Sequence, residues 1–317
     1  MTDINIYAFG GTGINILNKY LLEGKSSKLI GNVVGIDTSN ANPVVDNAYP
    51  LERLEGAEGS GGDKKAYIDK YPDFVKQVLA KHQPNKLNVV IFSTGGGTGA
   101  SAGPFAVRYM LQKKIPVLAL VVGDMSTVNE QNNTVGTLGS LYNQTKLGSS
   151  VLFSYLENGP SISQGEINRA AVGIIDNFAT MFNLENERID YADIKNFFYY
   201  TDVVAAEPVL TQLAFLQESD VPSYKRTPVA AMSLYNNIDE IKTPFEDMLY
   251  RKAGIFGSRY QGVGQPMHAV LDHGNTLDSL KEMIANKENR SNELSGRFKN
   301  KETNLFGGSD VDDDGMM

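Results

Sequence analysis

The sequence predicts an α/β protein: a doubly wound, mostly parallel sheet, followed by a second, smaller α/β domain, a helix and an acidic tail. Two observations carry this prediction. Short apolar runs typical of buried strands alternate with stretches of helical spacing through the first 182 residues. Several of these runs end in glycine-rich or polar turns. Strands that alternate with helices form parallel βαβ units, whose ligands bind at the carboxyl ends of the strands.

The most informative turn is the stretch Ser93–Ser101, with the sequence STGGGTGAS. It follows the apolar run 87–92 and precedes a stretch of helical spacing. Glycines let backbone N–H groups approach an anion, and a helix N-terminus adds partial positive charge. The hydroxyls of Thr98 and Ser101 are candidate donors to the same anion. A tightly packed βα turn is the alternative, but four glycines favour phosphate: Gly95, Gly96, Gly97 and Gly99.

A second strand–glycine–helix unit begins the chain. The strand Ile4–Phe9 leads into Gly10, Gly11, Thr12 and Gly13. Alone this turn is weak evidence, because many dinucleotide-binding folds have a similar one. Beside the first stretch it gains weight, since two such loops can hold a polyphosphate between them. Asn15 follows in the predicted helix, where it faces either a base or solvent.

Two further loops are open to two interpretations each. Asp37 ends a predicted strand, where an acid either binds a ribose or is simply solvated. The loop 59–65 either contacts a γ-phosphate or links two elements at the surface. It contains Gly61, Gly62 and Asp63, followed by Lys64 and Lys65.

A long helix is predicted from Glu166 to about Phe182, with Asn168 near its start as a cap-region or a ligand-binding residue. Beyond it, Asp190 and Asp193 stand three positions apart and share a face if this segment is helical. Acids in a first turn usually complement the helix dipole. Alternatively, they orient a water molecule or a metal ion.

The second half contains no glycine-rich phosphate loop. We expect strands at 227–235 and 267–271 and helices at 211–217 and 244–252. The predicted organisation is a nucleotide-binding domain at 1–182, a connecting region at 183–204 and a second α/β domain at 205–274. A polar helix at 275–303 and an acidic tail at 304–317 follow. By composition the tail is either solvated or docks on a neighbouring molecule.

Composition excludes several classes of function. The 317 residues contain no cysteine, which rules out disulfides and cysteine-ligated metal and fits a reducing cytoplasm. The net charge of −8 argues against direct nucleic-acid binding. No signal peptide or membrane-spanning run is recognisable. The three histidines form no ligand motif.

Taken together, the motifs resemble those of the tubulin/FtsZ family of polymerising GTPases. The stretch Gly95–Ser101 is similar to the GGGTGSG signature and departs at its last two positions. The stretch Ser126–Asn133 is similar to the tubulin pattern STVVEPYN, and Ile189–Ile194 is similar to the bacterial VDFADV synergy loop. Two further departures are Thr134, where the bacterial pattern has arginine, and Arg188, where an asparagine is usual.

The resemblance assigns roles to individual residues. Asn15 and Asn168 are expected at the guanine and Glu130 near the ribose, with Asn133 closing the same pattern. The loops at Gly10, Asp37, Gly61–Asp63 and Gly95 are expected to hold GTP or GDP with Mg²⁺. Asp190 and Asp193 are expected to polarise the attacking water in the site of the next subunit.

The resemblance also implies partners and a setting. Subunits are expected to form a longitudinal homopolymer, with the tail docking on a neighbour and no direct contact to nucleic acid or membrane. The chain looks most like a bacteriophage-encoded tubulin of the PhuZ type, whose filaments position viral DNA in the host cytoplasm; a cargo adaptor is not identified. The alternatives are a Rossmann-type NAD(P)-binding enzyme and a nucleotide-binding filament scaffold without turnover.

Overall fold

The computed structural model describes residues 3–159, 161–258, 264–274, 278–279 and 282. Residues 1–274 form one compact unit and residues 275–317 a second. Almost all of the predicted helix at 275–303, and the whole acidic tail at 304–317, lie outside the described residues.

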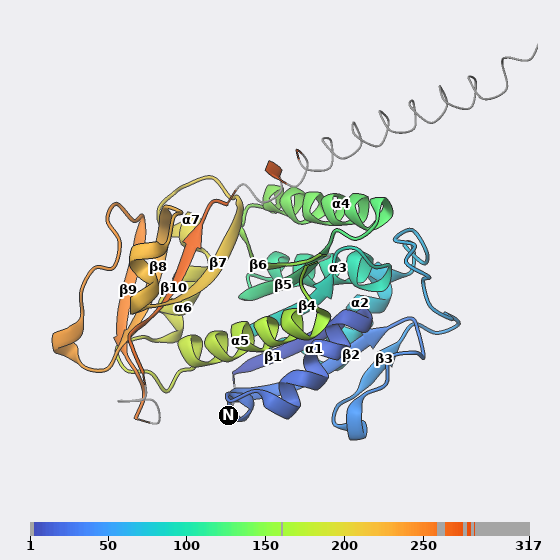
Figure 1. Ribbon diagram of the computed structural model, residues 1–317, viewed down its shortest axis with the longest axis horizontal. Coiled ribbons are helices and arrows are strands. Elements are labelled where there is room, and N and C mark those ends of the chain that lie inside the picture. Colours follow the sequence, from blue (N-terminus) through green and yellow to red (C-terminus); the bar gives the residue numbers. More distant parts are fainter. Residues whose placement is uncertain (1–2, 160, 259–263, 275–277, 280–281, 283–317) are drawn as a thin grey trace, which may run out of the picture. The chain divides into compact units, whose positions relative to one another are not determined.

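Ten strands form one sheet in the order β3-β2-β1-β4-β5-β6-β7-β10-β8-β9 (Figure 1). The strands are β1 (Ile4–Phe9), β2 (Ile30–Asp37), β3 (Leu51–Arg53), β4 (Leu87–Ser93), β5 (Val117–Asp124), β6 (Val151–Asn158), β7 (Leu210–Gln217), β8 (Pro228–Tyr235), β9 (Tyr250–Ile255) and β10 (Met267–Asp272). The helices are α1 (Gly10–Glu23), α2 (Tyr71–Lys81), α3 (Thr98–Gln112), α4 (Val128–Gln144), α5 (Gln164–Phe182), α6 (Tyr191–Phe198) and α7 (Tyr200–Val203).

The first seven strands are parallel, which confirms the predicted doubly wound sheet. Helices α1 and α5 pack together on one side, and α2, α3 and α4 pack together on the other (Figure 1). Every residue of β1 and of β4 is buried. Apart from Asn5, Asn88 and the terminal Ser93, both strands are apolar, because helices cover both faces of a parallel sheet.

Two helices predicted in the second half are wrong. The segment 211–217 is strand β7, and 244–252 contains no helix but ends in strand β9. Strand β7 pairs with β6 on one side and β10 on the other, so both of its edges are hydrogen-bonded. A segment this short gains little as an isolated helix, and the neighbouring strands decide its conformation.

The sheet is continuous across the boundary predicted at residue 205. Beyond that boundary the relative direction of neighbouring strands changes. Strand β7 is parallel to β6, and β10 is antiparallel to both β7 and β8. The division into two domains therefore stays a prediction about sequence organisation. The carboxyl ends of β1, β2, β4, β5 and β6 meet at one edge of the sheet, where a ligand site is expected.

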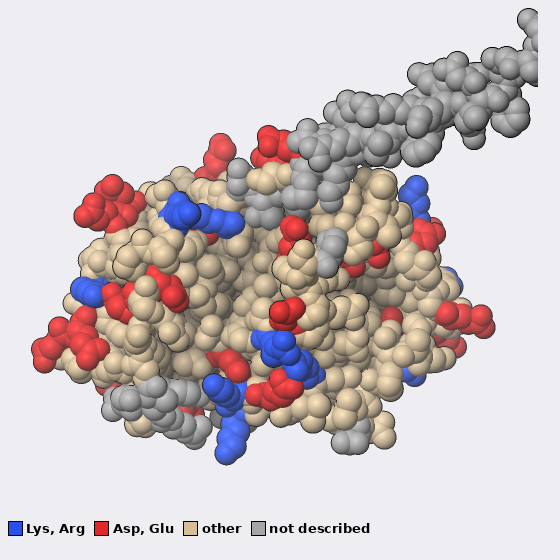
Figure 2. Space-filling view, viewed as in Figure 1, with Lys and Arg blue, Asp and Glu red and all other residues tan. Residues whose placement is uncertain are grey.

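Charged side chains of both signs are interspersed over the face shown in Figure 2. A search of the described helices for one with the length and hydropathy of a membrane span finds none.

Candidate nucleotide-binding site

A cavity of about 350 Å³ opens at the carboxyl ends of β1, β2 and β4. Four of the predicted loops line it. The predicted residues among its lining are Gly10, Gly11, Thr12, Asp37, Gly61, Gly96, Gly97, Thr98 and Gly99. The tertiary structure thus brings together segments that lie up to 90 residues apart in the sequence.

Helices α1 and α3 both begin at this cavity, and neither has a side-chain cap at its N-terminus. Neither has an acidic residue in its first turn. Helices α4, α5 and α6, by contrast, each begin with a capping box. The first N–H groups of a helix need an acceptor. At α1 and α3 that acceptor position faces the cavity, which makes the cavity suited to an anion.

Glycine is required at two positions of this cavity for different reasons. Gly10 has φ +69°, a conformation that L side chains rarely adopt, and a Cβ there would lie 3.0 Å from the Gly99 nitrogen. Gly97 has no room for a Cβ, because Ser60 Oγ and the Asp63 carbonyl occupy that space. The close approach of the loops therefore depends on the absence of side chains.

Side-chain hydrogen bonds fix the loops to one another. Thr98 Oγ1 lies 2.6 Å from Thr38 Oγ1 and 3.4 Å from Ser60 Oγ. Asp37 is 2% exposed and accepts hydrogen bonds from the Thr38 N–H and from Asn42 Nδ2. Its burial excludes the alternative of a solvated strand end.

A smaller cavity of about 80 Å³ adjoins the first, since Thr12 and Ser93 line both. Asn15 and Asn168 line it together, as α1 packs against α5. Helix α5 begins at Gln164, so Asn168 lies in its second turn rather than at its start. Three further polar residues, which no sequence motif singled out, also line it: Asp124, Asn158 and Gln164. The sequence feature that could have identified them is their position: two end predicted strands, and the third begins the helix that follows.

Helix α4 joins two of the loops. Asn133 Nδ2 donates to the carbonyls of Gly95 (3.0 Å) and Gly62 (3.4 Å). Glu130 caps α4 by accepting from the Thr127 N–H and hydroxyl, and its Cβ lies against Gly95. Asn133, Glu130, Gly62, Asp63, Gly95 and Gly13 surround or support the cavities without being among their lining residues.

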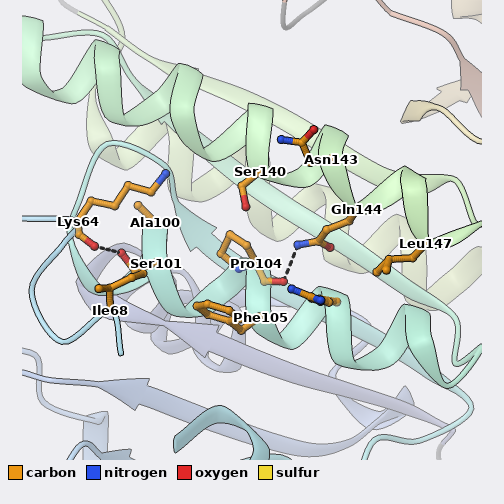
Figure 3. Close-up of a pocket in the computed structure, with 11 residues that line it drawn as sticks. Lys64, Ile68, Ala100, Ser101, Pro104, Phe105, Ser140, Asn143, Gln144 and Leu147 are labelled. Carbon is orange, nitrogen blue, oxygen red and sulfur yellow. Dashed lines mark hydrogen bonds between the residues drawn. The ribbon is translucent and has the colours of Figure 1, made fainter. Parts of the chain in front are cut away.

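Two expected phosphate contacts are wrong. Ser101 Oγ donates to the Lys64 carbonyl at 2.5 Å, and Lys64 Nζ donates to Thr137 Oγ1 at 2.8 Å. Both residues line a different cavity of about 260 Å³ between α3 and α4 (Figure 3). Burial lowers the pKa of Lys64 to about 8. Lys64 therefore anchors the loop 59–65 to α4 instead of pointing into the candidate phosphate cavity, the one of about 350 Å³ at the strand ends.

Asp190 and Asp193 form the capping box of α6. The Asp193 N–H donates to Asp190 Oδ1 at 2.9 Å, and the Asp190 N–H donates to Asp193 Oδ2 at 3.1 Å. Asp193 Oδ2 also pairs with Lys252 Nζ at 2.8 Å. Within one chain both acids therefore have the structural role that helix starts commonly give them. Of the two, Asp190 is the more exposed.

The two acids lie at the opposite end of the molecule's core from the cavities. Helix α5 begins at the smaller cavity and has 19 residues, which corresponds to a length of about 28 Å. Helix α6 follows it and packs against β8 and β9 (Figure 1). One molecule therefore does not bring Asp190 to its own phosphate cavity.

Metal binding would depend on the ligand. The described residues contain no group of three or more His, Asp or Glu side chains placed to hold an ion. The phosphate cavity does offer the carboxylates of Asp37 and Glu58 and the hydroxyl of Thr98. Mg²⁺ commonly binds through one or two such oxygens together with substrate phosphates, so the donor set fits a magnesium–nucleotide complex.

No family model matches the chain. It is similar to a phage tubulin-like protein of Pseudomonas phage 201phi2-1, with 23% identity over 313 residues, 97% of this chain and 96% of the relative. A solved protofilament of TubZ from bacteriophage PhiKZ is similar with TM-score 0.83 and 22% identity, covering 100% of this chain and 98% of the other. The phage tubulin PhuZ, solved with GDP, is similar with TM-score 0.83 and 20% identity over 99% and 96%. The tubulin-like fold and the resemblance to phage tubulins are confirmed.

Proposed function

We propose that this protein is a GTPase that polymerises into filaments and hydrolyses GTP between successive subunits. The single observation that carries the proposal is the pair of uncapped helix starts, α1 and α3, facing one cavity beside the asparagine-lined one. Phosphates at the first cavity and guanine at Asn15 and Asn168 fit this arrangement. The amides of both asparagines offer donors and acceptors, as a guanine edge requires.

Mg²⁺ would be held by the nucleotide phosphates together with oxygens of Asp37, Glu58 or Thr98. It would neutralise the negative charge of the phosphates and of the carboxylates that line this cavity. The nucleotide itself is kept in place by this chain's own backbone N–H groups and hydroxyls.

Hydrolysis requires an oriented water, and the candidates to orient it lie at the far end of the core. In a head-to-tail stack the α6 end of one subunit meets the phosphate cavity of the next. Asp190 is the better candidate, because Asp193 Oδ2 already bonds the Asp190 N–H and pairs with Lys252. Phosphoryl transfer needs a positioned water and stabilised charge more than a strong nucleophile.

The similarity to phage tubulins supports a role in positioning phage DNA within the host cytoplasm. The acidic tail at 304–317 would strengthen the polymer by docking on a neighbouring copy. The cavity between α3 and α4 suits such a segment, since the apolar side chains of Phe105 and Leu147 line it (Figure 3) and the cationic Arg108 is among its lining residues. It also contains Gln144 Oε1, a buried acceptor with no hydrogen-bond partner among the described residues.

The substitution Asp190→Asn tests the split site. Asparagine caps a helix as well as aspartate, so the fold should be retained. GTP binding should be unchanged, while phosphate release falls to background and filaments become over-stable. The matched control is Asp73→Asn, the same change in the first turn of α2, which should leave phosphate release unchanged.

Light scattering and phosphate release with GTP, GDP and NAD distinguish the proposal from its alternatives. Assembly and phosphate release with GTP alone support it. Assembly without phosphate release would indicate a scaffold, and binding of NAD without assembly would indicate a dinucleotide enzyme.

A further inference from the structure

The phosphate cavity lacks cationic side chains. Asp37 and Glu58 are the ionisable residues among its lining, which includes no Lys or Arg in the part of the chain that the structure describes. Three cations lie on neighbouring segments. Lys64 Nζ bonds Thr137, and Arg53 Nε donates to the Ser39 carbonyl at 3.1 Å. Lys65 is exposed and is not among the lining residues. Without a cationic side chain, Mg²⁺ and backbone N–H groups alone would stabilise the charge of the transition state.

Arg188 lies at the other end of the core, two residues before Asp190. Its backbone has φ +66°, a conformation that costs an ordinary L residue about 1–2 kcal/mol. Both neighbours hold it there. Glu187 exchanges backbone hydrogen bonds with Ile255 at 2.9 and 3.0 Å, and Ile189 is 5% exposed against Gly254.

The strained backbone presents an exposed guanidinium. Within the described residues, Arg188 makes no side-chain hydrogen bond or ion pair, whereas the nearby Lys252 is paired with Asp193. No contact of its side chain among the described residues therefore accounts for a long cation at this position. Six described non-glycine residues have positive φ, and two of them are cations. Lys114 bonds Ser149 and Asp202, whereas Arg188 has no such partner, and strain at an exposed residue of this kind motivates a functional hypothesis.

We propose that Arg188 enters the phosphate cavity of the next subunit and binds the γ-phosphoryl oxygens in the transition state. The proposal rests on the proposed function, because it needs a head-to-tail polymer. Arg188 and Asp190 lie on the same short segment, so the stacking that delivers one also delivers the other. A guanidinium suits the role because its planar fork of donors matches phosphate oxygens.

The reaction balances without a further reactant. A bond forms from the water oxygen to the γ-phosphorus, and the bond from that phosphorus to the β–γ bridging oxygen breaks. The electron pair of the broken bond stays on the β-phosphate of the departing GDP. The proton of the water passes to Asp190 and then to solvent. Arg188 gives up no atom and acts only by charge and hydrogen bonding.

The main test is the substitution Arg188→Asn, because asparagine tolerates φ > 0 and preserves the backbone. In polymer, kcat for phosphate release should fall at least about 100-fold, as for other arginines supplied in trans. GTP affinity of the free subunit should not change, and Arg188→Lys should recover part of kcat. Lys195→Gln removes another exposed cation, on α6, and should leave kcat unchanged.

A complementation experiment tests action in trans. Gly97→Ala subunits keep Arg188 but have an obstructed phosphate loop. Arg188→Asn subunits have an intact phosphate loop but lack the arginine. Mixing the two inactive variants should restore phosphate release. Doping Arg188→Asn into wild-type polymer should lower turnover in proportion to the fraction incorporated, even if the variant does not assemble alone.

Wild-type turnover in the Arg188→Asn polymer, or an unchanged rate in the doping series, would overturn the proposal. If the Asp190→Asn polymer is inactive in the same assay, the split site survives and only the arginine assignment fails. If wild-type protein shows no GTP-dependent polymer at all, the proposed function itself fails.

Discussion

At the residue scale, the direction of a side chain decides whether it faces the candidate ligand cavity or supports a neighbouring loop. Thr98 and Ser101 stand three positions apart near the start of α3, and both carry hydroxyls. Thr98 faces the phosphate cavity, whereas Ser101 bonds the Lys64 carbonyl behind it. Lys64 in turn reaches α4. Two hydroxyl residues of one motif thus differ in place: one faces the cavity, and the other holds a neighbouring loop in position.

Lys64 provides a prediction about pH. Its pKa is lowered to about 8 from 10.5, so between those values the unfolded chain holds a proton that the folded protein has released. This group's contribution to stability therefore rises with pH across that window. Urea unfolding between about pH 7 and 10 should show wild-type protein gaining stability relative to Lys64→Met, by at most about 1.4 kcal/mol per pH unit. A difference between wild type and Lys64→Met that does not change with pH would contradict the prediction.

At the scale of elements, helix starts distinguish structural from functional termini. Thr127, Ser163 and Asp190 cap α4, α5 and α6 with side chains, and these helix starts are satisfied within the chain. The starts of α1 and α3 lack such caps and face the cavity. Helix α4 then holds the loops in place through polar side chains on its inner face.

Thr134 and Thr137 are the two polar α4 residues with no exposed surface. The Thr134 hydroxyl lies 2.9 Å from Thr94 Oγ1 and donates to the Asp124 carbonyl at 3.1 Å. An arginine would not fit here, which explains the departure from the bacterial pattern in steric terms.

The substitution Thr134→Val keeps the shape and removes these hydrogen bonds. We expect it to lower the free energy of unfolding by about 1–3 kcal/mol, since buried partners are left unpaired. Urea unfolding measures this loss. Asn132→Ala, at an exposed position of the same helix, should change stability by less than about 0.5 kcal/mol. Equal effects of the two substitutions would argue against the role of Thr134.

At the scale of the whole molecule, the distance between the cavities and α6 determines that any joint site needs two subunits. Helix α5 spans the core between them, so the proposed polymer would complete a site that the monomer lacks. Coupling of hydrolysis to assembly would then follow from this geometry. It requires no conformational switch within the subunit.

Tail docking is a prediction at this scale. Removing residues 307–317 should raise the critical concentration for assembly at least about 10-fold, a loss of about 1.4 kcal/mol, without changing nucleotide affinity. Arg108→Glu, in the cavity between α3 and α4, should do the same by repelling the acidic tail.

The two changes should not add when combined, because each removes the same contact. Sedimentation measures the critical concentration. Lys76→Glu, an exposed charge reversal on α2, is the control. Additive effects would place the tail elsewhere, and unchanged assembly of the truncated protein would refute a role for the tail.

The sequence by itself determined the parallel core and the glycine loops at the ends of its strands. Apolar runs such as Ile6–Phe9 and glycine turns such as Gly95–Gly99 are local patterns whose physical meaning depends little on distant residues. The tertiary structure decided the rest. Strand β7 took its conformation from its neighbours, and Ser101 and Lys64 turned away from the phosphate because their partners lie on other segments. Asn15 and Asn168 met only through the packing of α1 on α5. The placement of Asp190 and Arg188 an entire helix away from the phosphate loops likewise depends on where the chain runs in space, which no local pattern encodes.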